Sequence, residues 1–253
     1  MKRIVSTVFV LSASLCLSSL GLWAQTEEGH LSRGFYVKVK PGGAAAFEAG
    51  LKAHIQWRKS QGDTWTWAVY QVINGEATGD YMIRSAAHTW EDFDKYQPFL
   101  DKMAPHFYAS VGDSILGIES SIGTTATEIS MIPPSFEGYT LFQLITFHIR
   151  PDQQQAFRAA IGQVHATLVK ANWPGYYIWV YPINGGSGPE VTLVLPFKSF
   201  ADMKQPEKTL PQVLTEALGE AEATGLMQKF DNSVRGEDSG MIRFRPDLSL
   251  IQQ

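Results

Sequence analysis

The sequence predicts an α+β protein made of two tandem copies of one β-α-β-β-α-β unit. The first observation is a repeat with an offset of 110 residues: VKVKPGGAAAFEAGLKAHI and WAVYQVING return as FHIRPDQQQAFRAAIGQVH and YIWVYPING. The second is the uninterrupted register, in which Phe47 aligns with Phe157 and Asn74-Gly75 with Asn184-Gly185. A repeat of this length indicates a duplicated domain rather than a solenoid of small units.

The first 24 residues have the pattern of a secretory signal peptide. Lys2 and Arg3 precede the apolar stretch 4–22, and Ala24 is a small residue before a plausible cleavage point. A retained membrane anchor is the alternative, although serines interrupt the apolar stretch. We therefore expect a periplasmic or secreted protein. Cys16 is the only cysteine, so a mature chain without the leader must be stabilised by its core rather than by disulfides.

The net charge of the chain limits the kinds of binding partner that we expect. The formal net charge of −4 becomes −6 once the two leader cations are removed, and no basic tract is present. A mildly acidic protein of this kind is not suited to nucleic acid or to an anionic membrane surface. We expect no nucleic-acid partner, no membrane association after signal cleavage, and a monomer or homodimer.

The elements of the first copy follow from local periodicity. Phe35, Val37 and Val39 alternate with polar residues, which predicts a strand that ends at Pro41. Phe47, Leu51 and Ile55 fall on one stripe of a helix over residues 44–59. The aromatic and β-branched stretch 65–73 predicts a second strand, and the Asn74-Gly75 turn leads to a third. The remaining predicted elements are strand 80–85, a helix from Trp90 through Leu100 capped by Thr89 or Ser85, further helix at 106–118, and a closing strand at 124–132.

The second copy repeats this order. We predict strands at 141–149, 176–183, 190–196 and 239–245, a helix at 152–170, and helices between 199 and 235. The order β-α-β-β-α-β is that of the ferredoxin-like unit. The predicted domains are residues 33–133 and 139–246, and Pro133-Pro134-Ser135 is the predicted linker.

A family resemblance rests on two short segments in each copy. A first strand that ends V-K-P-G, followed five residues later by a phenylalanine on an amphipathic helix, resembles the dimeric α/β barrel superfamily. This superfamily includes the antibiotic-biosynthesis monooxygenases, the NIPSNAP-like proteins and the stress-responsive barrel domains. The resemblance implies that two ferredoxin-like sheets pack face to face into a barrel, with both sheets supplied here by one chain.

Strong catalytic motifs are absent from the sequence. It contains no G-x-G-x-x-G, no P-loop, no H-E-x-x-H and no cysteine cluster, so it indicates no cofactor and no metal. His54 and His165 lie on the first helix of each copy, and His148 lies on the polar face of a first strand. A histidine in such a position is more often a packed, hydrogen-bonded residue than a ligand.

Aromatic residues crowd the second strand of each copy. These are Trp65, Trp67 and Tyr70 in the first copy and Tyr176, Tyr177, Trp179 and Tyr181 in the second. Tyrosine and tryptophan suit pocket walls because they combine large apolar area with a polar tip. The alternative is that they fill the seam between the two sheets. Arg84, a charge in an otherwise apolar strand, is expected to meet Asp80 or a ligand anion.

Two functions from different classes remain. The first is an exported module that binds a small apolar or aromatic molecule. The second, implied by the resemblance, is a cofactor-free or haem-dependent monooxygenase. Members of that group use an Asn-Trp-His or an Asn-Trp-Tyr-Arg set, and neither first strand here contains the asparagine. Haem would need an axial histidine, for which His54, His165 and His148 are the candidates.

The resemblance places a ligand between the sheet and the helices that cover it. His54, Trp57 and Arg84 of the first copy are the predicted contacts, because their equivalents Val164, Thr167 and Val194 are smaller and uncharged. A ligand in the seam between the sheets would instead contact Tyr36, Lys38, His148 and Trp179. Trp67, on the aromatic second strand of the first copy, is a further candidate contact.

Overall fold

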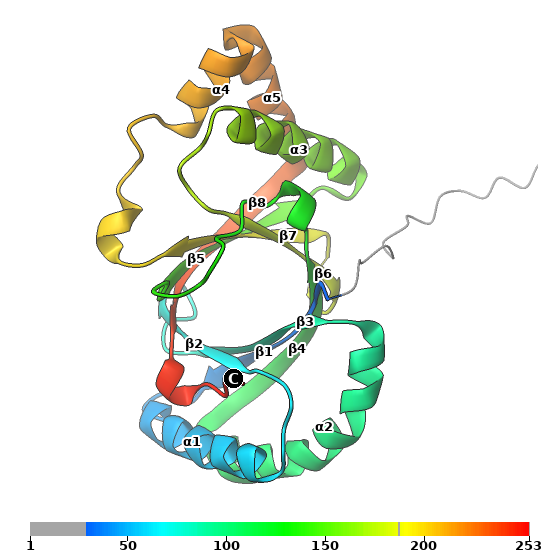
Figure 1. The fold of residues 1–253 in the computed structure, drawn as a ribbon, viewed down its shortest axis with the longest axis vertical. Coiled ribbons are helices and arrows are strands. Elements are labelled where there is room, and N and C mark those ends of the chain that lie inside the picture. The colour runs from blue at the N-terminus through cyan, green and yellow to red at the C-terminus, as the bar shows by residue number, and fades with distance from the viewer. Residues whose placement is uncertain (1–28, 187, 253) are drawn as a thin grey trace, which may run out of the picture.

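Eight antiparallel strands close into one barrel, and all helices lie outside it (Figure 1). The computed structural model describes residues 29–186 and 188–252. Around the barrel the strand order is β1-β3-β2-β8-β5-β7-β6-β4, and β4 returns to pair with β1. The predicted signal peptide, residues 1–24, lies outside the described residues. No helix in the described part of the chain is both long enough and apolar enough to span a membrane.

Strands and helices follow one another in the same order in both halves, except that two helices in the second half take the place of the second helix of the first half. The first half contains β1 (Leu31–Val39), α1 (Ala44–Ser60), β2 (Ala68–Asn74), β3 (Tyr81–His88), α2 (Trp90–Val111) and β4 (Ile115–Thr125). The second half contains β5 (Leu141–Ile149), α3 (Gln154–Lys170), β6 (Ile178–Asn184), β7 (Glu190–Phe197), α4 (Leu210–Leu218), α5 (Glu220–Ser233) and β8 (Val234–Phe244). Single 3-10 turns join several of these elements.

The closed barrel corrects the predicted arrangement of two tandem ferredoxin-like units. We expected two separate sheets that pack face to face, but the strands of the two halves are hydrogen-bonded edge to edge. β2 pairs with β8 and β4 pairs with β6, so that one continuous sheet runs around the molecule. Closure leaves fewer unpaired strand edges than two open sheets would. The α+β class is unaffected.

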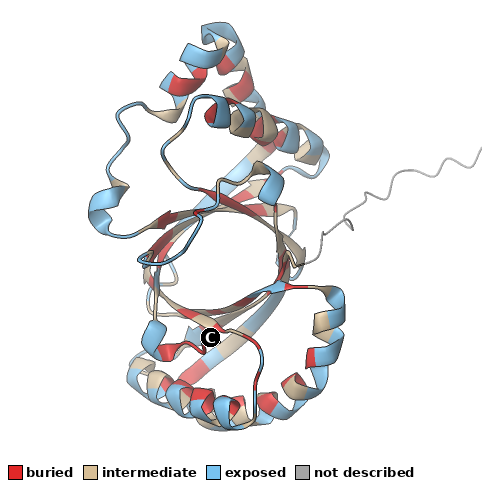
Figure 2. Ribbon diagram, in the orientation of Figure 1, coloured by how far each residue is buried: buried red, intermediate tan, exposed pale blue. Residues whose placement is uncertain are grey.

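Helices cover the barrel on two opposite sides. α1 and α2 lie against the strands of the first half, and α3 and α5 against those of the second, while α4 packs on α3 and α5 further out (Figure 1). Two hydrophobic cores fill the spaces between strands and helices, and the outward faces of the helices are exposed (Figure 2). Phe47 and Phe157 take equivalent buried positions in these cores, as predicted. Phe47 packs on Tyr81, with ring centroids 4.7 Å apart, and Phe157 on Trp179 at 6.0 Å.

The sequence misplaced the end of the first half. One continuous helix, α2, runs through Pro98 and Pro105, where we expected two helices. It begins with a capping box in which Thr89 and Asp92 bond each other's backbone N–H. The closing strand spans Ile115–Thr125 rather than 124–132, because its serines, glycines and glutamate give no apolar alternation.

Each half is completed by a tail from the other half. After β8 the chain passes beneath α1, where Leu248 is buried and Leu250 exchanges two backbone hydrogen bonds with Trp67. Arg245 at the start of this tail forms an ion pair with Glu48 of α1. In the opposite direction, Met131 exchanges two backbone hydrogen bonds with Tyr177. These crossings connect the two halves beyond the barrel sheet.

Candidate functional site

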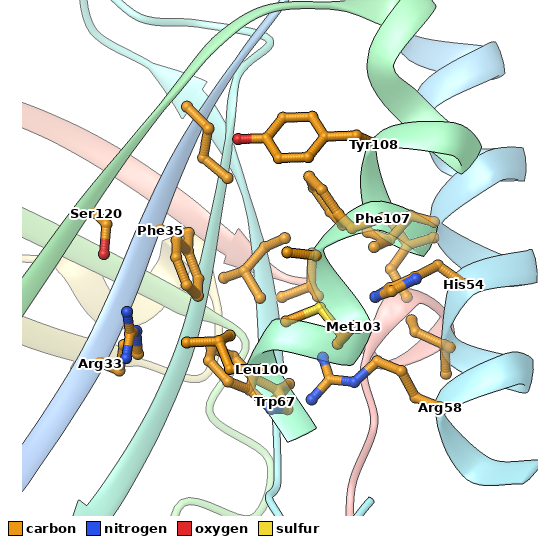
Figure 3. A pocket seen from close by; sticks show the side chains of 17 residues that line it. Arg33, Phe35, His54, Arg58, Trp67, Leu100, Met103, Phe107, Tyr108 and Ser120 are labelled. Carbon is orange, nitrogen blue, oxygen red and sulfur yellow. The ribbon is translucent and has the colours of Figure 1, made fainter. Parts of the chain in front are cut away.

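A cavity of about 350 Å³ lies between the first-half strands and the two helices that cover them. Figure 3 shows side chains from the strands on one side and from α1 and α2 on the other. Most of the wall is apolar or aromatic, and the polar groups are few. The lining residues are Arg33, Phe35, Leu51, His54, Ile55, Arg58, Trp67, Val69, Ile83, Leu100, Met103, Ala104, Phe107, Tyr108, Ile118, Ser120 and Leu248.

His54 supplies one polar group to this cavity from α1. Its side chain is buried, and its Nδ1 lies 2.9 Å from Nδ1 of His106 on α2. Its other nitrogen, Nε2, is buried and has no hydrogen-bond partner. Burial, with the nearby Arg58 and His106, lowers the pKa of His54 to about 3. His54 is therefore a neutral imidazole at neutral pH, with one nitrogen left for a ligand.

Arg33 supplies a second polar group from β1, on the opposite wall (Figure 3). Its guanidinium packs against the rings of Phe35 and Phe93, at 5.5 and 5.9 Å from their centroids. Burial lowers its pKa, and its Nε is buried without a partner. Arg33 Nε and His54 Nε2 are the only buried side-chain nitrogens or oxygens without a partner among residues 29–186 and 188–252. Both belong to residues that line this cavity.

Arg58 plays a different part because its charge is already paired. Its Nε donates to Asp63 Oδ2 at 2.5 Å, and its Nη2 donates to Tyr96 Oη at 2.9 Å. The guanidinium lies over the Trp67 ring, 4.8 Å from the centroid, and Trp67 Nε1 donates to Tyr96 Oη at 3.2 Å. This network fixes the indole that forms one wall of the cavity.

His106 connects the buried His54 to the outer layer between α1 and α2. It is half-buried, and its ring stacks on Trp57 with centroids 4.3 Å apart. Ser110 lies one turn further along α2, where its hydroxyl donates to the His106 carbonyl at 2.8 Å. The same hydroxyl oxygen lies 3.2 Å from His106 Nδ1. A hydrogen-bonded chain therefore leads from Ser110 through His106 to His54.

One substitution between the halves explains why the cavity lies in the first half. Val69 pairs with Ile83 across β2 and β3, and 110 residues later Trp179 pairs with Leu193 across β6 and β7. Trp179 fills the space under α3 by packing on Phe147 and Phe157. The smaller valine leaves the corresponding space open. A second cavity of about 340 Å³ lies elsewhere, near the turn between β6 and β7.

Of the residues predicted to contact a ligand, His54 and Trp67 line the first cavity. Trp57 does not, because it stacks on His106 behind His54. Arg84 points away from Ile83 and therefore into the barrel, near Tyr70; Asp80 instead accepts hydrogen bonds from Tyr36 and Val39. His148 and Trp179 belong to the second half, where His148 bonds Asp238 at 2.6 Å.

The interpretation that the second-strand aromatic residues fill the seam between the sheets was wrong for Trp65, Trp67 and Trp179, since Trp65 also lies in the first-half core. Trp67 and Trp179 lie between strands and helices, in the two hydrophobic cores, and not inside the barrel.

Sequence reasoning missed three residues of the site region. Arg33 had a signal, because period-two alternation places it on the same face as Phe35 and Val37. Arg58 follows the apolar stripe of α1 closely but was not considered. His106 had no signal, because the predicted break in α2 left its helical face undefined.

Haem does not fit the residues present. His54 is the only candidate axial histidine at the first cavity, and its unpartnered Nε2 is the atom that would have to bind iron, so the available space decides the question. A porphyrin with its side chains is larger than this cavity of about 350 Å³. His165, which is bonded to Tyr177 at 2.9 Å, and His148, which is bonded to Asp238, line neither the first cavity nor the second. In the described part of the chain, no group of three or more His, Cys, Asp or Glu side chains is arranged to hold a metal ion.

Solved structures with the same fold include several proteins with oxygen chemistry in their names. An anthrone oxidase-like protein aligns over 87% of this chain and 92% of its own, with 16% identity and a TM-score of 0.53. A proposed monooxygenase from Lactobacillus acidophilus covers 89% and 100%, with 10% identity and a TM-score of 0.53. A chlorite dismutase variant from Candidatus Nitrospira defluvii covers 87% and 93%, with 11% identity and a TM-score of 0.52. At these identities the likeness shows a shared fold. No protein-family model matches the chain, and no curated protein is similar enough in sequence to match it.

Proposed function

We propose that the protein binds a small, flat aromatic molecule in the first-half cavity. The observation that carries this proposal is that the two unpartnered buried nitrogens, Arg33 Nε and His54 Nε2, both belong to the cavity wall. A buried polar group without a partner costs roughly 1–3 kcal/mol, so a ligand that bonds both would recover that free energy. The aromatic and aliphatic wall between them suits the body of the ligand.

The two nitrogens also define the polar groups of the ligand. An arginine Nε–H only donates, so the group that meets Arg33 must be an acceptor such as a carbonyl, phenolate or enolate oxygen. Trp67 presents its ring to the cavity and suits stacking against a flat molecule. The proposed ligand therefore has an apolar ring system with at least one acceptor oxygen on its edge.

Oxidation of such a molecule by O₂, without a cofactor, is the second candidate function. It is supported by neighbours in fold that are named an anthrone oxidase-like protein and proposed monooxygenases. In the reaction of an anthrone, the ring methylene loses two hydrogens and gains one oxygen atom, and the second atom of O₂ leaves as water. Arg33 and His54 would stabilise the oxyanion that develops when the methylene loses its proton.

Anthrone is a suitable probe for both candidates, since it is flat and apolar and carries one carbonyl oxygen. We expect it to quench tryptophan fluorescence because Trp67 lines the cavity, and we expect His54→Ala to weaken binding. Val164→Ala, at the equivalent position of the second half, is the matched control and should bind as the parent does. Equal loss in both variants, or no quenching in the parent, would contradict binding at this cavity. Uptake of O₂ with anthrone separates the oxidase from a binding protein.

The proposed place of this activity is the periplasm or the exterior of the cell. The support is the leader-like composition of residues 1–24, with its basic start and apolar stretch.

A further inference from the structure

We propose that Ser110, His106 and His54 form a proton relay that connects the cavity to solvent. The relay rests on the proposed function insofar as it serves an oxidation in the cavity. Its hydrogen bonds, however, are formed by residues of the protein and need no ligand. Three features carry it: a short contact between two imidazoles, a serine that sets the direction of the hydrogen bonds, and a solvent-facing end.

The first feature is the contact between the histidines. The two Nδ1 atoms face each other at 2.9 Å, so a single proton lies between them. When that proton belongs to His106, neutral His54 must hold its own proton on Nε2. When it belongs to His54, Nε2 is bare and accepts instead. Each ring thus changes tautomer as the shared proton moves.

The second feature is Ser110, which fixes the resting direction. Its hydroxyl proton is used in the 2.8 Å bond to the His106 carbonyl, so its oxygen is an acceptor toward His106 Nδ1 at 3.2 Å. This places the shared proton on His106 Nδ1, from which it is donated to both Ser110 Oγ and His54 Nδ1. In the resting state His54 therefore carries Nε2–H, which is its unpartnered atom.

The third feature is the end of the hydrogen-bonded series that faces solvent, which is His106 Nε2. His106 is half-buried, and its Nε2 has no protein partner within the described residues. Within those residues the buried polar side-chain atoms without a partner are only Arg33 Nε and His54 Nε2, so His106 Nε2 is not buried. Water therefore reaches His106 Nε2, while His54 Nε2 on the inner side meets the cavity.

A transfer into the cavity is balanced at every atom. His54 Nε2–H breaks and the proton passes to an oxyanion of the bound molecule. His106 Nδ1–H breaks and that proton passes to His54 Nδ1, and His106 Nε2 takes a proton from water. Both rings remain neutral overall, which suits the buried His54, whose protonated form is disfavoured by its surroundings.

The reverse transfer restores the starting tautomers, which gives the relay a use in each turnover. Oxidation of a methylene by O₂ requires a proton to leave carbon and one to be delivered to the peroxide oxyanion that forms. In its resting tautomer His54 Nε2 already holds a proton, so the relay meets the second of these needs by protonating the peroxide oxyanion. The bare Nε2 left behind then accepts the carbon proton of the next molecule, and this reverse transfer restores the resting tautomers. His106 and Ser110 do not line the cavity, so they are positioning residues that act through His54.

The test compares the parent with His106→Asn by ¹⁵N NMR of the histidine rings. Asparagine can still donate to His54 Nδ1 from the position of His106 Nδ1, but it has no second nitrogen to exchange with solvent. We expect the Nε2–H tautomer of His54 in both proteins, and exchange of that proton with water at least about tenfold slower in the variant. His165→Asn, which removes the histidine bonded to Tyr177 in the second half, is the control and should leave this exchange unchanged.

Two results would overturn the relay: equal exchange rates in parent and His106→Asn, or an Nδ1–H tautomer of His54 in the parent. Neither measurement needs a ligand. Where the parent oxidises anthrone, His106→Asn should bind anthrone as the parent does and turn it over at least about tenfold more slowly. A parent that neither binds nor oxidises anthrone would refute the proposed function, while the exchange rates would still decide the relay.

Discussion

Val69 and Trp179 occupy equivalent positions in the two halves of the barrel, and their difference in size leaves the space beside Val69 open and the space beside Trp179 filled. Each faces the covering helices from the second strand of its half, opposite Ile83 and Leu193 respectively. Val69 lines the cavity of about 350 Å³, whereas Trp179 packs on two phenylalanines. The two copies of the duplicated unit therefore differ at this position, and the cavity of the second half lies elsewhere, near the turn between β6 and β7.

Exchanging these two side chains should move the cavity. Val69→Trp should fill the first-half cavity and weaken anthrone binding by at least about tenfold, because the indole takes the space of the ligand. Trp179→Val should open the second half at a cost of about 3–5 kcal/mol in the free energy of unfolding. Fluorescence titration and urea denaturation measure the two effects. Unchanged binding by a folded Val69→Trp protein would place the ligand elsewhere.

The two buried phenylalanines should contribute similarly to stability. Phe47 and Phe157 are almost fully buried between the first helix of each half and the barrel. Truncation of either to alanine should cost about 3–5 kcal/mol, since it removes the ring and leaves a void. Chemical denaturation gives this value directly. A parent-like midpoint in both variants would mean that the helices do not pack on these side chains.

The buried ion pair beside Trp67 should be sensitive to the loss of one partner. The side chains of Arg58 and Asp63 are 5% and 0% exposed, so Asp63→Asn leaves a buried, uncompensated guanidinium. We expect a loss of about 3–5 kcal/mol in the free energy of unfolding. The control is Glu216→Gln, which breaks an exposed pair with Lys208 and should cost less than about 1 kcal/mol. Similar small losses in both would contradict the burial of Arg58.

His54 should make the fold sensitive to acid. Its pKa is about 3 in the folded protein, against an ordinary value of 6.5, so below pH 6.5 the unfolded chain gains a proton that the folded one refuses. The free energy of unfolding therefore has its full value above pH 6.5. It falls by a few kcal/mol as the pH is lowered toward 3. His54→Gln should reduce this loss, as thermal unfolding across the pH range will show. An identical pH dependence in parent and variant would mean that His54 is not desolvated.

Export can be tested without knowledge of the ligand. Expressed with its own leader, the protein should be recovered outside the cytoplasm with Gln25 at its N-terminus, because Ala24 precedes the expected cleavage point. N-terminal sequencing of the fractionated protein measures this. Recovery of Met1 in a membrane fraction would instead support the anchor.

Local periodicity was enough for the features that depend on near neighbours along the chain. The stripe of Phe47, Leu51 and Ile55 identified α1 and its buried face, and the 110-residue register identified Phe157 as its equivalent. The alternation of Phe35, Val37 and Val39 identified β1. Where such alternation was lacking, as in β4, the predicted strand was in the wrong place, because pairing partners rather than side-chain pattern determine its bounds.

Closure of the barrel and the content of the site were decided only by tertiary structure. The bonds that join β2 to β8 and β4 to β6 link segments far apart in the chain, and the backbone groups that form them are the same for every residue type. His54 and His106 are 52 positions apart and meet only because α1 and α2 pack side by side on one face of the sheet. The volume of the cavity beside Val69 likewise depends on which side chains of the neighbouring strands and helices pack around it. The sequence by itself determined which residues face a helix or a strand, and packing in three dimensions determined which of those faces encloses a space.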